Sequence, residues 1–234
     1  MVYDMVIGGL VETKSIVSPS SLALTNKAQT DGVGRVHKTI DAENQVSLNE
    51  FDNNGNKTKS RDANGVGLDC AFNSRNLDVS CTDTQGDTSS KTFDKNNNII
   101  SQTDSLGKTT LFVFDARNRL SSTTNRIGST VTNIYDANSN VLSVTDGQGN
   151  PTQYVYDARN LQTQRIFADT QDVADKVVLT YDAVQRKTSQ LDQKGDLISY
   201  QFDMANRLLQ RQYPDSLNDV FSYDAASRLT QAVS

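Results

Sequence analysis

Residues 109–128 of the chain read TTLFVFDARNRLSSTTNRIG. Thr109–Phe114 is rich in β-branched and aromatic residues, a composition typical of a strand. Asp115–Asn118 predicts a turn, because Asp and Asn tolerate left-handed φ and bind local amides. Arg119–Thr124 predicts the return strand, and Asn125–Gly128 a second turn in which glycine supplies a positive φ. The stretch therefore predicts one antiparallel hairpin that leads into the next.

This pattern recurs along the chain at a fixed step, and from one unit to the next the numbering usually advances by 21. An aromatic residue followed by Asp or Asn starts each unit, and we call its position slot zero. The aromatic residues at slot zero are Tyr3, Phe51, Phe72, Phe93, Phe114, Tyr135, Tyr156, Tyr181, Phe202 and Tyr223. The step lengthens to 25 between Tyr156 and Tyr181, and Thr30-Asp31 starts a unit without the aromatic. Internal repeats with such a period indicate a repeat architecture rather than an ordinary globular domain.

Other slots keep the same phase. Of the 25 Asp residues, ten stand at slot one and six at slot eleven, and slot fourteen holds 6 of the 13 Gly. Slot six is aliphatic at Val36, Ile99, Leu120, Val141, Leu208 and Leu229, and the aliphatic residue moves to slot five at Leu77 and Leu161. We expect slot six to lie opposite slot zero on one face of the sheet; a two-residue turn would instead send it to the other face.

The predicted fold class is all-β, with tandem antiparallel hairpins, one for each repeat unit, that form a curved or spiralling sheet, a partial β-shell. About twenty strands are expected, and open sheets rarely pass about ten strands without curling or splitting. We therefore expect a curved wall lining a hollow, or two walls flattened together. Residues 1–29 are predicted to be a divergent N-terminal repeat or cap, and residues 30–234 the repeat sheet, whose last unit is incomplete and suggests a fragment.

Composition excludes several classes of protein. The chain has 234 residues with 23 basic and 28 acidic side chains, a net charge of −5, so it carries no basic footprint for nucleic acid. Only 35% of the residues are hydrophobic and no run of about 18 apolar residues occurs, so no membrane span is expected. The N-terminus lacks the features of a secretory signal, so export would need another route or a larger parent chain.

The pattern Tyr/Phe-Asp-Ala-x-Asn-Arg-Leu, followed by an Asp-x-x-Gly turn, resembles the YD repeat of the Rhs family. Phe114–Leu120, Tyr135–Val141 and Tyr223–Leu229 carry it most clearly, and the resemblance covers residues 30–234 and more loosely 3–29. It implies a spiralling β-shell. In bacterial polymorphic toxins and insecticidal toxin complexes that shell encloses a C-terminal toxin, and in teneurins and wall-associated proteins it serves adhesion.

Family shells end in an Asp-Pro motif tied to self-cleavage. The three prolines here follow Ser18, Asn150 and Tyr213, so self-cleavage is not carried over. We therefore expect a non-enzymatic shell segment without cofactor, secreted or at the cell surface as part of a larger system. Its expected partners are a toxin cargo or further YD-repeat segments. Two alternatives stay open: a cell-surface module that binds carbohydrate or protein, and a scaffold that self-assembles edge to edge, since both ends expose strand edges.

Some residues carry open alternatives. Cys70 and Cys81 fall on the two strands of one hairpin, either as a cross-strand disulfide or as two thiols, because a register shift of one residue would separate them. Tyr154 and Tyr200 could stack sugar rings or pack between hairpins. The stretch Arg165–Lys176 holds the four extra residues of the long unit and predicts a protruding, solvated loop.

Candidate chemistry is sparse. His37, the one histidine, is expected to be a solvated strand residue, because the nearby Ser and Asp are explained by strands and turns. Asp52–Asn56 and Asp94–Asn98 resemble calcium loops, but neither has the Glu at position twelve, so hairpin turns are favoured. No Cys/His cluster of zinc spacing occurs. No catalytic residue and no metal ligand is predicted.

Overall fold

The computed structural model describes residues 2–6, 10–16, 25–167 and 175–233, with side chains from residue 27 onward. Each regular element in these ranges is a β-strand, so the all-β prediction is confirmed. The described residues contain no helix suited to crossing a membrane. The chain divides into two compact units, Met1–Asn118 and Arg119–Ser234, and each is described by itself.

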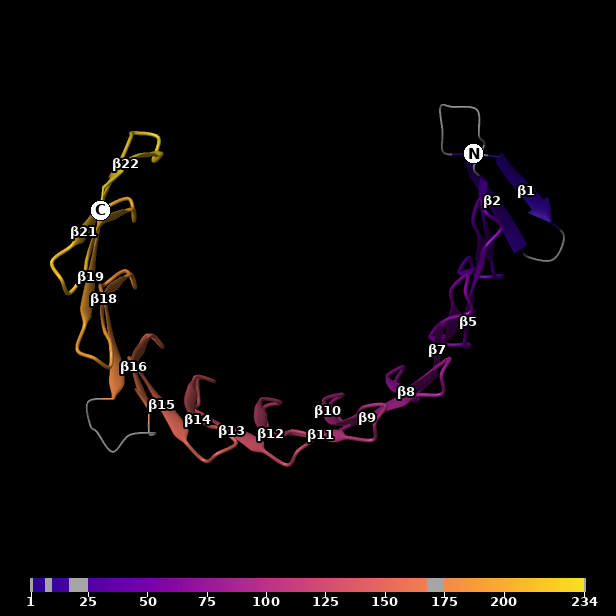
Figure 1. Ribbon diagram of the computed structural model, residues 1–234, viewed down its shortest axis with the longest axis horizontal. Coiled ribbons are helices and arrows are strands. Elements are labelled where there is room, and N and C mark those ends of the chain that lie inside the picture. The colour runs from indigo at the N-terminus through magenta and orange to yellow at the C-terminus, as the bar shows by residue number, and fades with distance from the viewer. Residues whose placement is uncertain (1, 7–9, 17–24, 168–174, 234) are drawn as a thin grey trace. The chain divides into compact units, whose positions relative to one another are not determined.

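Unit 1 is a sheet of eleven strands in which each strand pairs antiparallel with its neighbours in the chain (Figure 1). Its strands are β1 (Val2–Val6), β2 (Leu10–Ile16), β3 (Thr25–Thr30), β4 (Val36–Ile40), β5 (Val46–Phe51), β6 (Lys57–Arg61), β7 (Gly67–Phe72), β8 (Asp78–Asp83), β9 (Thr88–Phe93), β10 (Ile99–Thr103) and β11 (Thr109–Phe114).

Unit 2 repeats this order, again with pairing between chain neighbours. Its strands are β12 (Leu120–Thr124), β13 (Thr130–Tyr135), β14 (Val141–Thr145), β15 (Pro151–Tyr156), β16 (Gln162–Phe167), β17 (Lys176–Tyr181), β18 (Lys187–Leu191), β19 (Leu197–Phe202), β20 (Leu208–Gln212), β21 (Asn218–Tyr223) and β22 (Leu229–Val233). The boundary predicted at residues 29 and 30 stays a prediction.

The register that places slot zero opposite slot six is confirmed. Tyr135 lies opposite Val141, and the register then shifts by one residue at a β-bulge, so that Ile134 faces Ser143. Repeats with leucine at slot five keep this register, as Phe72 shows by lying opposite Asp78 at slot six. Because one residue at the bulge has no partner on the opposite strand, slot nine lies on the same face of the sheet as slot zero.

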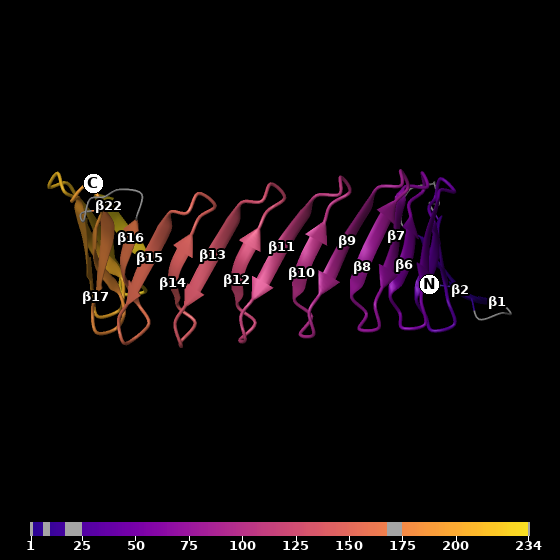
Figure 2. The ribbon, with the colours of Figure 1, turned by 90° about the horizontal axis from the view of Figure 1, so that it is seen from below.

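The same kind of turn joins the strands at both of their ends, and Figure 2 shows these turns as two rows of loops. We call slots one to five the first turn and slots eleven to fifteen the second turn. In the second turn Asp146–Asn150, the Asp146 N–H donates to the Asn150 carbonyl at 3.0 Å, and Gly149 has a φ of 92°. In the first turn Asp157–Leu161 the same bond measures 2.9 Å and Asn160 has a φ of 62°. This is a type I turn followed by a left-handed residue, a common three-residue hairpin loop.

Each of the two compact units is a single layer of strands. Among the described residues no hydrophobic side chain is buried, and Asp219, with 8% of its surface exposed, is the one buried residue. The aromatic residues of slot zero from Phe51 to Tyr223 are half-buried, whereas slot minus one is exposed, as at Val113 (54%) and Ile134 (57%). The sheet is therefore stabilised mainly between adjacent strands, as in repeat proteins whose units contact only their neighbours.

The structure corrects the predicted loop at Arg165–Lys176. Arg165–Phe167 belongs to β16 and Lys176 begins β17, and the Phe167 N–H donates to the Asp175 carbonyl at 3.1 Å. Strand pairing thus continues on both sides of the insertion, because Arg165 lies opposite Val177. Residues 168–174 lie outside the described residues.

Replacing Gly107 by Ala is expected to lower the free energy of unfolding by about 1–2 kcal/mol, because L residues disfavour the left-handed region. Gly107 has a φ of 76° and an added Cβ would meet no atom within 4 Å, so the cost is in the backbone alone. Gly32→Ala is the matched control, since Gly32 has equal space without a left-handed φ. Urea unfolding measures both variants, and equal losses would contradict the assignment.

Candidate functional site

The carboxylate at slot one caps its own turn. In the turn that begins at Asp136, Oδ1 accepts the N–H groups of Asn138 and Asn140, both at 2.8 Å. Oδ2 accepts the side-chain amide of Asn140 at 2.8 Å. The turn therefore has its exposed backbone donors satisfied by one side chain, which is the known capacity of Asp in turns.

Arginine at slot five connects one repeat hairpin to the next. Arg207 Nε donates to Asp203 Oδ2 at 2.6 Å, and its Nη1 donates to the Asp224 carbonyl at 3.1 Å. Its guanidinium carbon lies 4.9 Å from the centroid of the Tyr223 ring. The stacking and the bond to the next carbonyl recur at Arg35, Arg119 and Arg186. One planar cation thus joins a turn, a ring and the following turn.

Repeats that lack arginine at slot five are connected to the next repeat by other side chains. Asn140 Nδ2 donates both to Asp136 Oδ2 and, at 2.8 Å, to Asn160 Oδ1 in the next first turn. Asn56 and Asn98 bridge in the same way to Asn76 and Asn118. Where slot five is leucine, an arginine at slot three takes over: Arg75 and Arg159 donate to the Asp94 and Asp182 carbonyls at 2.8 and 2.7 Å. Different side chains therefore meet one structural requirement.

The hydroxyl of slot-zero tyrosine adds a second link between units. Tyr135 Oη donates to the Leu120 carbonyl at 2.8 Å, across one unit of the repeat. The equivalent bonds run from Tyr156, Tyr181 and Tyr223 to the carbonyls of Val141, Gln162 and Leu208. Phenylalanine at slot zero packs in the same position without this bond. The aromatic column is thus part of the junction between hairpins.

The capping bonds lower the pKa of the turn carboxylates. For Asp52, Asp94 and Asp136 the largest cause is the side-chain amide of the asparagine at slot five, which stabilises the charged form. Backbone N–H groups are the largest cause for Asp146, Asp157, Asp203 and Asp224. For Asp31 and Asp182 desolvation raises the pKa, but the bonds and charge of Arg35 and Arg186 outweigh it.

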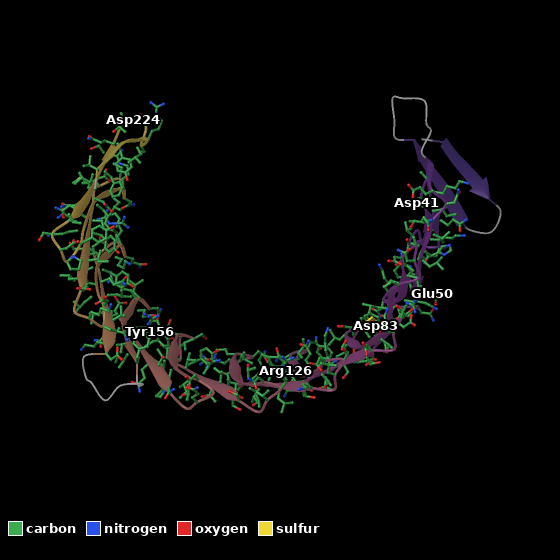
Figure 3. The ribbon with its side chains drawn as sticks, viewed as in Figure 1. Asp41, Glu50, Asp83, Arg126, Tyr156 and Asp224 are labelled. Atoms are coloured by element: carbon green, nitrogen blue, oxygen red, sulfur yellow. A yellow bond between two sulfur atoms is a disulfide. The ribbon has the colours of Figure 1, made fainter. Side chains whose placement is uncertain are left out.

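The slot-zero face also carries slots minus two and nine, which lie opposite each other across the hairpin. Cys70 lies opposite Cys81 there, and the structure joins them by a disulfide with an S–S distance of 2.06 Å. Figure 3 shows that side chains line both faces of the ribbon. The opposite face exposes aliphatic side chains, among them Leu111, Val113, Ile134, Val155 and Val220. The two faces are therefore chemically different.

Comparison with known proteins follows this geometry. The RHS Repeat family matches residues 93–130 and 135–171, two ranges that include β10 to β12 and β14 to β16. These two stretches make up about a third of the chain, and in them it is similar to RHS repeats. No curated protein matches it.

Two solved structures resemble this chain in fold. They are the crystal structures of TcdB2-TccC3 without its hypervariable C-terminal region and of TcdB2-TccC3. Each has a TM-score of 0.59 and 12% sequence identity over 94% of this chain. The chain covers 14% and 15% of those two chains, so it spans about one seventh of their length. At this identity the likeness shows the fold alone.

The structure places the other predicted residues as follows. Tyr154 lies opposite Arg165, and Tyr200 lies opposite Arg211 with Lys187 Nζ 4.8 Å from its ring centroid. His37 is half-buried, and its Nε2 has no hydrogen-bond partner among the described residues. The backbone of Tyr3 lies in β1 opposite Thr13, and its side chain lies outside the described residues. Asp52–Asn56 and Asp94–Asn98 are hairpin turns.

Sequence reasoning missed the arginine junctions. Slot five is arginine at Arg35, Arg119, Arg186, Arg207 and Arg228, and this recurrence was the available signal. The recurrence could not show that the guanidinium covers the aromatic ring of the next hairpin. That contact joins side chains from two different hairpins, for example Arg207 and Tyr223.

Arg207→Lys is expected to lower the free energy of unfolding by about 1 kcal/mol, because an ammonium cannot donate in two directions while stacking on a ring. Arg228→Lys is the matched control. Arg228 forms the same ion pair with Asp224, but its side chain is 82% exposed, against 27% for Arg207. The control should change stability by less than about 0.5 kcal/mol. Chemical denaturation measures both, and equal effects would show that the ring contact contributes nothing.

The melting temperature is expected to be flat above about pH 5 and to fall as the pH drops below about 4, near the ordinary pKa of Asp. The folded-state pKa of the turn carboxylates is lowered, so their stabilising contribution is present above the unfolded value and is lost on acidification. Thermal unfolding monitored by circular dichroism at several pH values tests this. In the Asp136→Asn variant the melting temperature should fall less steeply on acidification. A melting temperature that already falls between pH 7 and pH 5 would refute the account.

Proposed function

We propose that residues 30–234 form a non-enzymatic segment of a shell wall, which helps to enclose a passenger polypeptide. One observation carries the proposal: each unit is a single layer of strands that pair only with chain neighbours, and no described hydrophobic side chain is buried. Such a sheet can be extended by adding units, because each junction repeats the same bonds. The match of two stretches of the chain to the RHS Repeat family and the fold of the TcdB2-TccC3 structures support this role.

The chemistry of the sheet supports a structural role. The slot-one carboxylates are used in turn caps and in bonds to arginine or asparagine, as Asp136 and Asp203 illustrate. The aromatic rings are used in junctions, as Tyr223 illustrates. In the described ranges, no group of three metal-binding side chains comes together. The residues that recur are therefore those that hold hairpins together.

The wall would act by separating a passenger from bulk solvent and from proteases. In the described residues, the backbone groups of adjacent strands pair with each other, and most turns are capped by an Asp or Asn side chain at their first residue, so these parts of the wall offer few unpaired groups to a passenger chain. We expect a toxin cargo or further YD-repeat segments as partners, and a secreted or surface-exposed location within a larger system. Binding of glycan at Tyr154 or Tyr200 and edge-to-edge self-association stay predictions.

Protease protection tests the proposal. A reduced, permanently unfolded model domain would be fused to residue 234 through a Gly/Ser linker and digested with trypsin. Enclosure or partial cover by the wall should slow cleavage of the passenger about fivefold or more, because cleavage follows the accessible population. The control carries the same linker and passenger on an unrelated folded domain of similar mass. A passenger cleaved at the control rate would contradict the proposal.

A further inference from the structure

The second turn between β20 and β21 departs from the repeat at slot eleven, where Tyr213 replaces the usual Asp. The backbone of the turn is kept, since the Tyr213 N–H donates to the Leu217 carbonyl at 2.9 Å. The cap is supplied from another position: Asp215 Oδ1 accepts the Leu217 N–H at 3.2 Å. The tyrosine ring is therefore not required to form this turn.

The ring of Tyr213 is held by the one buried residue of the described chain. Its hydroxyl donates to Asp219 Oδ2 at 2.9 Å. The same oxygen accepts Arg211 Nη2 at 2.5 Å and Arg211 Nε at 2.9 Å. The charge of Asp219 is thus balanced by Arg211, and the bond to the hydroxyl fixes the orientation of the ring.

A pocket of about 480 Å³ lies beside this ring. It is lined by Asp196, Tyr213, Pro214, Asp215, Leu217 and Asp219. Asp196 comes from the preceding second turn on the same edge of the sheet, Asp192–Asp196. The volume is within the range of small ligand sites. Tyr213, Pro214 and Leu217 provide apolar surface.

The pocket also carries unbalanced negative charge. Within the described part of the chain, Asp196 and Asp215 form no ion pair with a basic side chain, in contrast to Asp219. Both residues are exposed at the pocket, and the chain as a whole has a net charge of −5. Apolar surface beside two carboxylates that have no basic partner favours a ligand that is itself apolar along its length and cationic at its end.

We propose that this pocket binds the side chain of a lysine or arginine presented by a partner polypeptide. The aliphatic stem packs against Tyr213, Pro214 and Leu217, and the cationic head is neutralised by Asp196 and Asp215. A neutral sugar could use the ring but would leave both carboxylates without a counter-charge. The proposal does not depend on the shell role, since the pocket is built from two adjacent turns of unit 2.

The test uses the full chain and two small probes followed by amide NMR. Nα-acetyl-lysine methylamide should shift the amide signals of Leu217 and Asp196 with a dissociation constant in the millimolar range. Nα-acetyl-norleucine methylamide has the same stem without the charge and should bind about tenfold more weakly or not at all. Equal binding of the two probes would overturn the proposal, as would binding of methyl β-glucoside alone.

Variants locate the interaction. Asp196→Asn with Asp215→Asn should weaken lysine binding about tenfold, because the counter-charge is removed. Asp87→Asn is the matched control, since Asp87 occupies the same slot as Asp196 in the turn that begins at Asp83, and it should have no effect. Tyr213→Asn should also abolish binding without loss of fold, because Asn125 already caps a second turn through its Oδ1. Unchanged binding in the double or the Tyr213 variant would refute the site.

Discussion

The Asp carboxylate at slot one is the group on which the rest of the structure depends. A single layer of strands has no core to hold its hairpins in place, so the connection between units must be made at the surface. Asp203 accepts backbone donors of its own turn and the guanidinium of Arg207, which in turn reaches the carbonyl of Asp224. Each turn is thus both closed on itself and tied to the following one.

The aromatic column completes these junctions by packing under the cation. The Tyr223 ring lies beneath Arg207, and its hydroxyl reaches the Leu208 carbonyl at 3.0 Å. These bonds are half-exposed and modest one by one, but the repeat supplies them at each step. Where leucine replaces the slot-five arginine, as at Leu77, Arg75 reaches the next turn from slot three. The repeat therefore conserves a connection rather than a particular residue within this chain.

At one departure from the repeat the local structure also differs. Tyr213 breaks the slot-eleven pattern, and the structure there differs from other second turns: the cap moves to Asp215 and a pocket opens beside the ring. In the sequence alone, Tyr213 stood out only as the residue that precedes a proline. Its hydroxyl bond to Asp219 depends on the side-chain directions of two strands, which spacing along the chain cannot supply. The insertion before β17 is another irregularity, and there strand pairing resumes on both sides.

From the sequence by itself, the fixed period of the repeat determined the class of fold, the strands and the two turns. These follow from local chemistry, since Asp, Asn and Gly favour left-handed turns and β-branched and aromatic residues favour strands. The pairing of slot zero with slot six was the expected one of two registers, and the structure decided it. Only the tertiary structure decided which side chains meet across units: Arg207 on Tyr223, Cys70 with Cys81, and Tyr213 on Asp219. Such contacts depend on the bulge and twist of neighbouring strands, and a shift of one residue would send each partner to the opposite face.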